Sequence, residues 1–194
     1  SDLISIMLKK IATSALLVAV AATASIAGDK ISGAGASFPA PLYYDWAYKY
    51  GKETKSRVNY QSIGSGGGIK QISKRIVDFG ASDKPLKAKE LAKSKLLQFP
   101  AVIGSIVVAL NVPGIEDEKL HLKNEVVADI FAGKITMWND PKIVADNKGL
   151  KLPNQKIIVV HRSDGSGTTY NFTYYLNKSS ENWANNYGVG KAID

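Results

Sequence analysis

The chain has 194 residues, of which 45% are hydrophobic and 22% charged, an ordinary globular composition that argues against disorder. It has no cysteine and two widely separated histidines, which excludes disulfides, thiolate catalysis and the usual zinc ligand sets, so we expect no metal and no cofactor. The formal net charge of +8 favours anionic partners, and because the basic residues are scattered we expect a small anion and no nucleic acid.

The N-terminus has the pattern of an export signal. From Met7, "MLKK" supplies a positive region, "IATSALLVAVAA" an apolar stretch and "SIA" a small-x-small cleavage site before Gly28. We therefore assign residues 1–27 to upstream residues and a signal peptide, which predicts a periplasmic location. The apolar stretch is short for a membrane span, which needs about 20 residues. A retained anchor or a buried helix is the alternative.

Strands and helices alternate through the next part of the chain. Runs rich in β-branched and aromatic residues predict strands, and the stretches between them carry apolar residues at helical spacing. The expected strands are 30–35, 57–62 and 77–82, and the expected helices are 39–53, 66–76 and 87–95. The last helix, "KAKELAKSK", is typical of a solvated face. Repeated strand–helix units indicate an α/β fold with a parallel or mixed sheet.

The second half of the chain is more apolar at first. The run 99–112, "FPAVIGSIVVALNV", predicts a buried segment that crosses the protein. Helices are expected at 124–133, 140–147 and 167–176, and "KIIVV" predicts a strand at 156–160.

Four polar, glycine-rich loops follow predicted strands: "GAGASF", "GSGGG", "GASD" and "RSDGSGT". In open α/β sheets, ligands bind beyond the carboxyl ends of the strands, where the free N–H groups of the next helix carry partial positive charge. Glycine lets the backbone approach an anion closely. The alternative for Ser37, Ser65, Ser166 and Thr168 is simple helix capping. Four such loops together with Arg162 indicate an anion site.

Known phosphate and nucleophile motifs do not account for these loops. "GSGGGIK" fails the P-loop spacing, and the dinucleotide pattern GxGxxG meets Phe38 at its third glycine. The nucleophile elbow GxSxG would need glycine where the chain has Asp164. Ser166 with His161 as its base leaves open a secreted phosphatase or esterase, although no orienting acid is evident.

Five stretches carry a family resemblance: "GAGASFPAPLYYDWAYKY", "NYQSIGSGGGIKQI", "VDFGASDKPL", "LQFPAVIGSIVVALN" and "VVHRSDGSGTTYNFTYYL". They resemble the periplasmic phosphate-binding proteins of bacterial high-affinity phosphate ABC importers, over residues 30–194. The resemblance implies a two-lobed periplasmic binding protein fold, type II-like, whose α/β lobes are joined by hinge strands and close on one phosphate. The first lobe would lie in 28–102, and the hinge strand and second lobe in 103–194.

The resemblance also implies partners and site residues. The protein would be a monomer that captures inorganic phosphate and delivers it to the membrane permease of an ABC importer. A binding protein for another tetrahedral oxyanion is the nearest alternative. The residues implied to bind phosphate offer hydroxyl, N–H, guanidinium or carboxylate groups and are Ser37, Phe38, Ser65, Asp83, Arg162, Ser166, Gly167 and Thr168.

The chain departs from the family pattern in three places. Position 37 is Ser where Thr is common, which keeps the hydroxyl, and position 66 is Gly where a second Ser is common. The chain also stops where the family's sequence continues for a comparable length. We therefore expect both lobes to lack part of their sheets, and this stretch alone to bind phosphate poorly.

Three charged residues have distinct expected roles. Arg162 offers a forked cation that matches tetrahedral oxyanions, and Asp164 is expected to orient Arg162 or to form a turn. Asp83 would accept the proton that phosphate carries at neutral pH and that sulfate lacks, which disfavours sulfate. The alternative for Asp83 is a cap of the helix in "KPLKAKEL".

Overall fold

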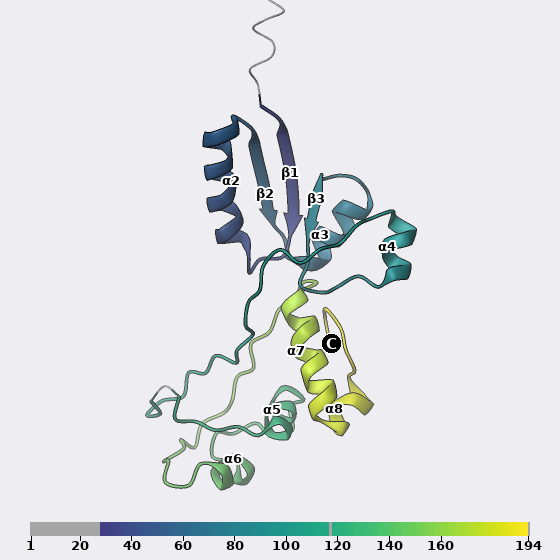
Figure 1. The fold of residues 1–194 in the computed structure, drawn as a ribbon. Coiled ribbons are helices and arrows are strands. Elements are labelled where there is room, and N and C mark those ends of the chain that lie inside the picture. The colour runs from purple at the N-terminus through teal and green to yellow at the C-terminus, as the bar shows by residue number, and fades with distance from the viewer. Residues whose placement is uncertain (1–27, 117, 194) are drawn as a thin grey trace, which may run out of the picture.

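The computed structural model describes residues 28–116 and 118–193. The predicted signal peptide at 1–27 lies outside these residues. The described chain forms two groups of elements, a sheet with its helices at one end and a helical group at the other (Figure 1). In this part of the chain, no helix combines the length and the apolar character that crossing a membrane requires.

A three-stranded parallel sheet forms the first group, in the order β2-β1-β3. The strands are β1 (Lys30–Gly35), β2 (Arg57–Ser62) and β3 (Phe79–Ala81). Because parallel neighbours need a crossover, helix α2 (Ala40–Thr54) joins β1 to β2 and helix α3 (Gly64–Ser73) joins β2 to β3. This order confirms the predicted alternation, and β1 and β2 have their predicted bounds.

The three strands end at one edge of the sheet. At the end of β1, Gly35 lies beside Ser62 of β2 and Ala81 of β3. The loops that follow the strands therefore leave from the same edge, which is where open α/β sheets bind their ligands.

The core of the sheet is aromatic and tightly packed. The ring of Tyr60 stacks on Phe79 with centroids 5.9 Å apart and meets Tyr43 edge-on at 5.0 Å. Gly33 faces the Phe79 ring, where a Cβ would overlap the ring. The Tyr60 hydroxyl donates to the Ala36 carbonyl at 2.7 Å, and burial raises the pKa of Tyr60 above its ordinary value. Strand β2 is thus bonded to the first residue of the loop that follows β1.

The second group is helical. Its elements are α5 (Asn124–Phe131), α6 (Pro141–Asp146), α7 (Gly167–Ser179) and α8 (Glu181–Asn186). One apolar cluster surrounds Ile143 and Trp138, and another joins Val127 of α5 to Leu176 of α7 and Trp183 of α8. The helices predicted near α5, α6 and α7 are confirmed. Helix α8 was not predicted, because "ENWANN" has too few apolar residues to show a helical period.

Two predictions for apolar segments are wrong. The segment 99–112 has no regular secondary structure and is largely exposed, with Ile103 97% and Val107 80% accessible. The strand predicted at 156–160 is reduced to one antiparallel bridge between Met137 and Lys156. An apolar run forms a strand only where a neighbouring strand pairs with its N–H and C=O groups. In the described residues, neither run lies in the sheet.

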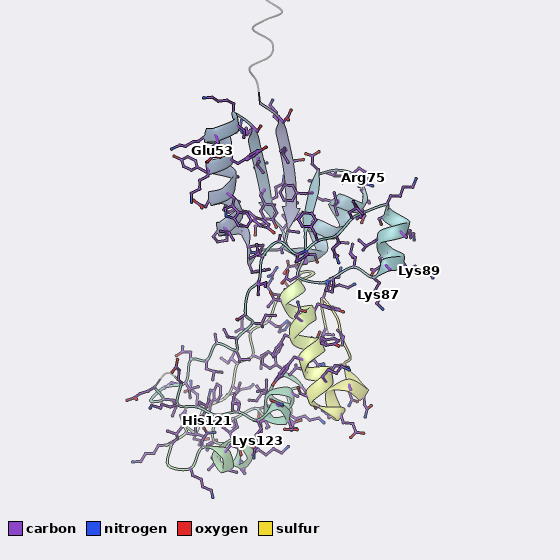
Figure 2. The ribbon with its side chains drawn as sticks, viewed as in Figure 1. Glu53, Arg75, Lys87, Lys89, His121 and Lys123 are labelled. Atoms are coloured by element: carbon purple, nitrogen blue, oxygen red, sulfur yellow. The ribbon has the colours of Figure 1, made fainter. Side chains whose placement is uncertain are left out.

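Helix α4 (Ala88–Ser94) follows the sheet and buries none of its residues. This confirms the solvated face predicted for the lysine-rich run, and Figure 2 shows Lys87 and Lys89 beside α4 at the outside of the molecule.

The division into lobes at 28–102 and 103–194 stays a prediction.

Candidate functional site

Three segments meet where the strands end (Figure 1): the start of α3, the turn after β3 and the loop before α7. The Gly66 N–H in the first turn of α3 donates to the Gly165 carbonyl at 2.7 Å. The hydroxyl of Thr168 in α7 donates to Asp83 in the turn after β3. The sheet and the helical group are therefore in direct contact at the predicted anion loops.

Asp83 lies at the centre of this junction. The Ser65 hydroxyl donates to one carboxylate oxygen (Oγ to Oδ1, 2.6 Å), and the Thr168 hydroxyl donates to the other (Oγ1 to Oδ2, 3.1 Å). The Asp83 N–H donates to Ser65 Oγ at 3.2 Å, and the Asn171 side chain donates to the Asp83 carbonyl at 2.9 Å. One aspartate thus links the start of α3 to the start of α7.

Ser65 and Ser166 are both 1% exposed, but they act differently. Ser166 is the N-cap of α7, and its Oγ accepts the Thr169 N–H at 3.2 Å. Ser65 lies inside the first turn of α3, after the N-cap Ile63, which offers no capping side chain. The capping alternative is therefore confirmed for Ser166 and wrong for Ser65. It is also wrong for Thr168, which lies within α7.

Arg162 and Asp164 form a forked ion pair in the loop before α7. Nε and Nη2 of Arg162 lie 2.5 and 2.6 Å from the two carboxylate oxygens of Asp164, which confirms that Asp164 orients Arg162. The hydrogen bond from Arg162 lowers the pKa of Asp164, and the same bond raises the pKa of Arg162. Both groups stay charged near neutral pH. The fork leaves the two N–H donors of Nη1 outside it.

Glycines at the starts of α3 and α7 leave room for these polar groups. A Cβ on Gly64, whose φ is +77°, would come within 2.5 Å of Asp164 Oδ2. A Cβ on Gly167 would come within 2.5 Å of the Asp83 carboxyl. Each helix start therefore packs directly against a charged group that the other segments present.

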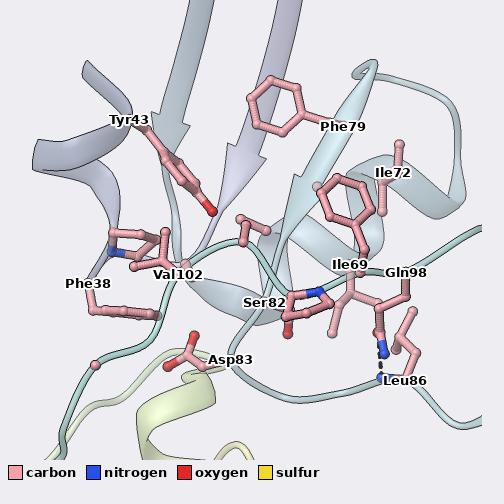
Figure 3. Close-up of a pocket in the computed structure, with 18 of the residues that line it drawn as sticks. Phe38, Tyr43, Ile69, Ile72, Phe79, Ser82, Asp83, Leu86, Gln98 and Val102 are labelled. Atoms are coloured by element: carbon pink, nitrogen blue, oxygen red, sulfur yellow. Dashed lines mark hydrogen bonds between the residues drawn. The ribbon is translucent and has the colours of Figure 1, made fainter. Parts of the chain in front are cut away.

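Ser37 and Phe38 follow β1 at the same edge. The exposed Ser37 accepts the Ala40 N–H at its carbonyl (3.2 Å), and the N-cap of α2 is Pro39, so Ser37 does not cap the helix through its hydroxyl. Phe38 borders a cavity of about 1090 Å³ together with Asp83 (Figure 3). The cavity also has apolar walls, which come from α3, β3 and the segment 96–107.

The structure thus brings some predicted site residues together and leaves others at the border. Ser65, Asp83 and Thr168 are joined by hydrogen bonds, and Gly167 packs on the Asp83 carboxyl. Arg162 reaches the junction beside Gly64. The part that each plays in binding phosphate stays a prediction.

Two alternatives can be judged from the local contacts. Helix α4 has its N-cap at Lys87, so the prediction that Asp83 caps it is wrong. The hydroxyl of Ser166 serves as a cap, and the His161 ring approaches the Arg162 carbonyl at 3.1 Å; neither contact activates a nucleophile. Within the described chain, no cluster of three or more His, Cys, Asp or Glu side chains is arranged to hold a metal ion.

Sequence reasoning missed two contacts of this junction. Asn171 follows Gly167 by four residues, a spacing that places both on one side of α7 and that could have identified it. The main-chain bond between Gly66 and Gly165 involves no side chain, so the residue types give no signal for it.

Comparison with known proteins places the chain in a family. A family model described as a PBP superfamily domain matches residues 19–190. The chain belongs to the PBP superfamily. The PBP domain resembles a solved structure from Clostridium perfringens, described as a putative phosphate ABC transporter substrate-binding protein with bound phosphate. The TM-score is 0.56 at 21% identity, over 80% of this chain and 58% of that one. This likeness confirms the predicted fold class.

Curated relatives are closer in sequence. The chain is 58% identical over 165 residues to the phosphate-binding protein PstS of Haemophilus influenzae, covering 85% of this chain and 49% of the relative. It is 57% identical over 163 residues to the PstS of Pasteurella multocida, covering 84% and 47%. These relatives confirm the resemblance seen in the motifs. The chain spans about half the length of the curated relatives it matches.

Proposed function

We propose that this protein captures inorganic phosphate in the periplasm and delivers it to the membrane permease of an ABC importer. The names of the curated relatives support the ligand. The signal-like N-terminus supports the location, and the junction of α3, α7 and the turn after β3 supplies the chemistry. Because the relatives are about twice as long, the proposal concerns the whole protein.

The observation that carries the proposal is one carboxylate surrounded by groups that can donate hydrogen bonds to an anion. Two helix N-termini, the hydroxyls of Ser65 and Thr168, and the guanidinium of Arg162 all suit an oxyanion. Asp83 is an acceptor in their midst. An ionised carboxylate repels an anion unless a proton lies between them. Phosphate brings such a proton at neutral pH and sulfate does not, so the arrangement favours phosphate.

The hydroxyls give the site a simple way to receive its ligand. Ser65 and Thr168 now donate to Asp83, and a hydroxyl rotates readily to a new acceptor. When the anion enters, both can donate to its oxygens. Asp83 is then free to accept the phosphate proton, while the Nη1 donors of Arg162 lie outside the fork with Asp164.

Calorimetric titration with phosphate and with sulfate, at one fixed ionic strength, tests this function. The wild-type protein should prefer phosphate strongly. Arg162→Ala should lower the affinity for both anions by about tenfold to a hundredfold, because a charged donor is lost. Asp83→Asn should lower the phosphate-to-sulfate ratio.

Asp78→Asn is the matched control for Asp83→Asn. Asp78 also accepts a serine hydroxyl and a main-chain N–H, but both come from Ser32 of β1 rather than from α3 or α7. The ratio should stay at the wild-type value in this variant. Heat with sulfate or molybdate and none with phosphate would overturn the choice of ligand.

The proposed role is binding without turnover. Since Ser166 caps α7, we expect no steady release of nitrophenol from a chromogenic phosphate ester. Turnover that Ser166→Ala abolishes would establish the phosphatase alternative instead. Fractionation of cells that make the protein should recover it with the periplasmic proteins.

A further inference from the structure

Asn171 holds two segments of the junction together from within α7. Its side-chain Nδ2 donates to the Asp83 carbonyl at 2.9 Å and to the Gly167 carbonyl at 3.1 Å. Gly167 lies one helical turn earlier, whereas Asp83 is 88 residues away in the sequence. Both partners are acceptors, so this position needs a short side chain with two N–H donors on one atom, which an amide provides.

These bonds fix the main chain of Asp83 against α7. Thr168, in the same helix, also donates to the Asp83 carboxylate, so α7 holds both the carbonyl and the side chain of this residue. Ser65 holds the N–H and the other carboxylate oxygen from α3. The carboxylate is carried on a short side chain and follows its main chain. Its distance from the α7 N-terminus therefore depends on the bond from Asn171.

A second asparagine shows the same geometry in a purely structural place. Nδ2 of Asn147 donates to the Ile143 carbonyl four residues back (2.8 Å) and to the distant His121 carbonyl (2.7 Å). Asn147 is 4% exposed and lies in the helical group. Asn171 is only half-buried and borders the same cavity as Asp83. The same pair of bonds thus joins a helix to the loop at His121 in one case and to the anion site in the other.

We propose that Asn171 is a positioning residue for anion discrimination. It sets the place of the Asp83 carboxylate against the N-terminus of α7, and with it the preference for an anion that carries a proton. This inference rests on the proposed function, which gives Asp83 the phosphate proton. Without the Asn171 amide, the turn after β3 loses its main-chain anchor on α7 and keeps only the side-chain bond from Thr168. The carboxylate then no longer meets the proton of a bound anion in a fixed geometry.

Asn171→Ala and Asn171→Leu test the inference, with Asn186→Ala as the control. Leucine keeps the branched shape of the side chain and has a higher helix propensity than asparagine, which covers the case in which the alanine variant does not fold. In the control, Asn186 donates to the Asn182 carbonyl four residues back, a bond of the same kind within α8. Phosphate and sulfate affinities are measured by calorimetry in each variant.

We expect the phosphate-to-sulfate ratio to fall about tenfold in both Asn171 variants and to stay unchanged in Asn186→Ala. A merely structural role would not move this ratio, because a smaller competent fraction lowers both apparent affinities by the same factor. A wild-type ratio in folded Asn171 variants, alongside a lowered ratio in Asp83→Asn, overturns the inference.

Hydrogen exchange without ligand gives an independent readout. The Asp83 N–H, which donates to Ser65 Oγ at 3.2 Å, should exchange faster in both Asn171 variants and at the wild-type rate in Asn186→Ala. Unchanged exchange shows that Asn171 does not position Asp83. If the wild-type protein binds neither anion, the proposed function fails, whereas the exchange rate still decides whether Asn171 positions Asp83.

Discussion

Helices α3 and α7 begin side by side at the junction, but they are started differently. Helix α7 has a serine N-cap, Ser166, whose Oγ accepts a main-chain N–H of the first turn. Helix α3 begins after Ile63 with no capping side chain, and its serine, Ser65, donates to Asp83 instead. The start of α7 is thus stabilised within its own helix, whereas that of α3 depends on the other segments. A buried serine at a helix start therefore has no fixed role: Ser166 is itself the N-cap, whereas Ser65 lies two residues after the N-cap Ile63.

The largest effect is expected from Gly64→Ala at the start of α3. The left-handed φ of +77° costs about 1–2 kcal/mol for a residue with a Cβ, and overlap with the Asp164 carboxylate adds about 1–3 kcal/mol. Urea unfolding should show a loss of unfolding free energy equal to the sum of these two costs. The control is Gly133→Ala, where φ is +70° and nothing lies within 4 Å of the new Cβ. Equal losses in the two variants would mean that the ion pair does not pack on α3.

Gly167→Ala tests the packing at the start of α7. Here steric overlap is the only expected cause of destabilisation, because Gly167 does not have the left-handed φ of Gly64. The new Cβ would crowd Ser65 and the Asp83 carboxyl, which should cost about 1–3 kcal/mol in unfolding free energy. Phosphate affinity should fall as well, because Asp83 must move. Wild-type stability and affinity in this variant would show that the two helix starts are not in close contact in solution.

Substitutions of Ser166 separate capping from anion binding. Ser166→Ala should lower the unfolding free energy by about 1 kcal/mol, because the capping oxygen is lost. Ser166→Asp keeps a capping oxygen but places a charge at a position that is 1% exposed, which is costly to bury. The aspartate should abolish phosphate binding in calorimetry by charge repulsion. Ser180→Ala is the control, because Ser180 caps α8 by accepting the Trp183 N–H at 3.2 Å. This variant should lose stability but keep the wild-type phosphate affinity. Phosphate binding by Ser166→Asp would place the anion away from α7.

The smallest effect concerns Asp78, which pairs with a serine as Asp83 does but outside the junction. The N–H and hydroxyl of Ser32 donate to its carboxylate at 2.7 and 2.8 Å, and the N–H bond is the main cause that lowers the pKa of Asp78. Because the folded pKa lies below the unfolded value of about 3.9, the stabilisation is complete above that value and is lost as the pH falls through the folded pKa. Urea midpoints measured across this acid range should fall less steeply in Asp78→Asn. An identical pH slope would contradict the expectation.

The fold was most predictable where local pattern and pairing agree. The strands at 30–35 and 57–62 have alternating or compact apolar runs, turn residues at their ends and partners close in sequence, and the structure pairs them. The runs 99–112 and 156–160 are equally apolar, but a strand also needs a neighbour, and the run itself does not contain that information. Periodicity therefore predicted the helices better than the more distant strands.

The candidate site was predictable in its residue types more than in its connections. Glycine, serine and arginine in the loops after strands indicated an anion site, and the structure brings Ser65, Asp83 and Thr168 together. Which serine caps and which donates depends on where each helix begins, to the residue, and helix ends are the least regular part of the pattern. At Asn171, the four-residue spacing from Gly167 is a local signal, but the bond to the Asp83 carbonyl, 88 residues away, has none.

The main-chain bond between Gly66 and Gly165 bears on how such a protein diversifies. A link made of an N–H and a carbonyl does not use the side chains of Ser65, Thr168 or Asp83. A descendant can therefore replace Ser65, Thr168 or Asp83 with groups suited to another solute while the two loops keep their alignment. Mutations that change the bound solute can then occur without breaking the link between the two loops, so that the first steps toward a new ligand need not unfold the protein.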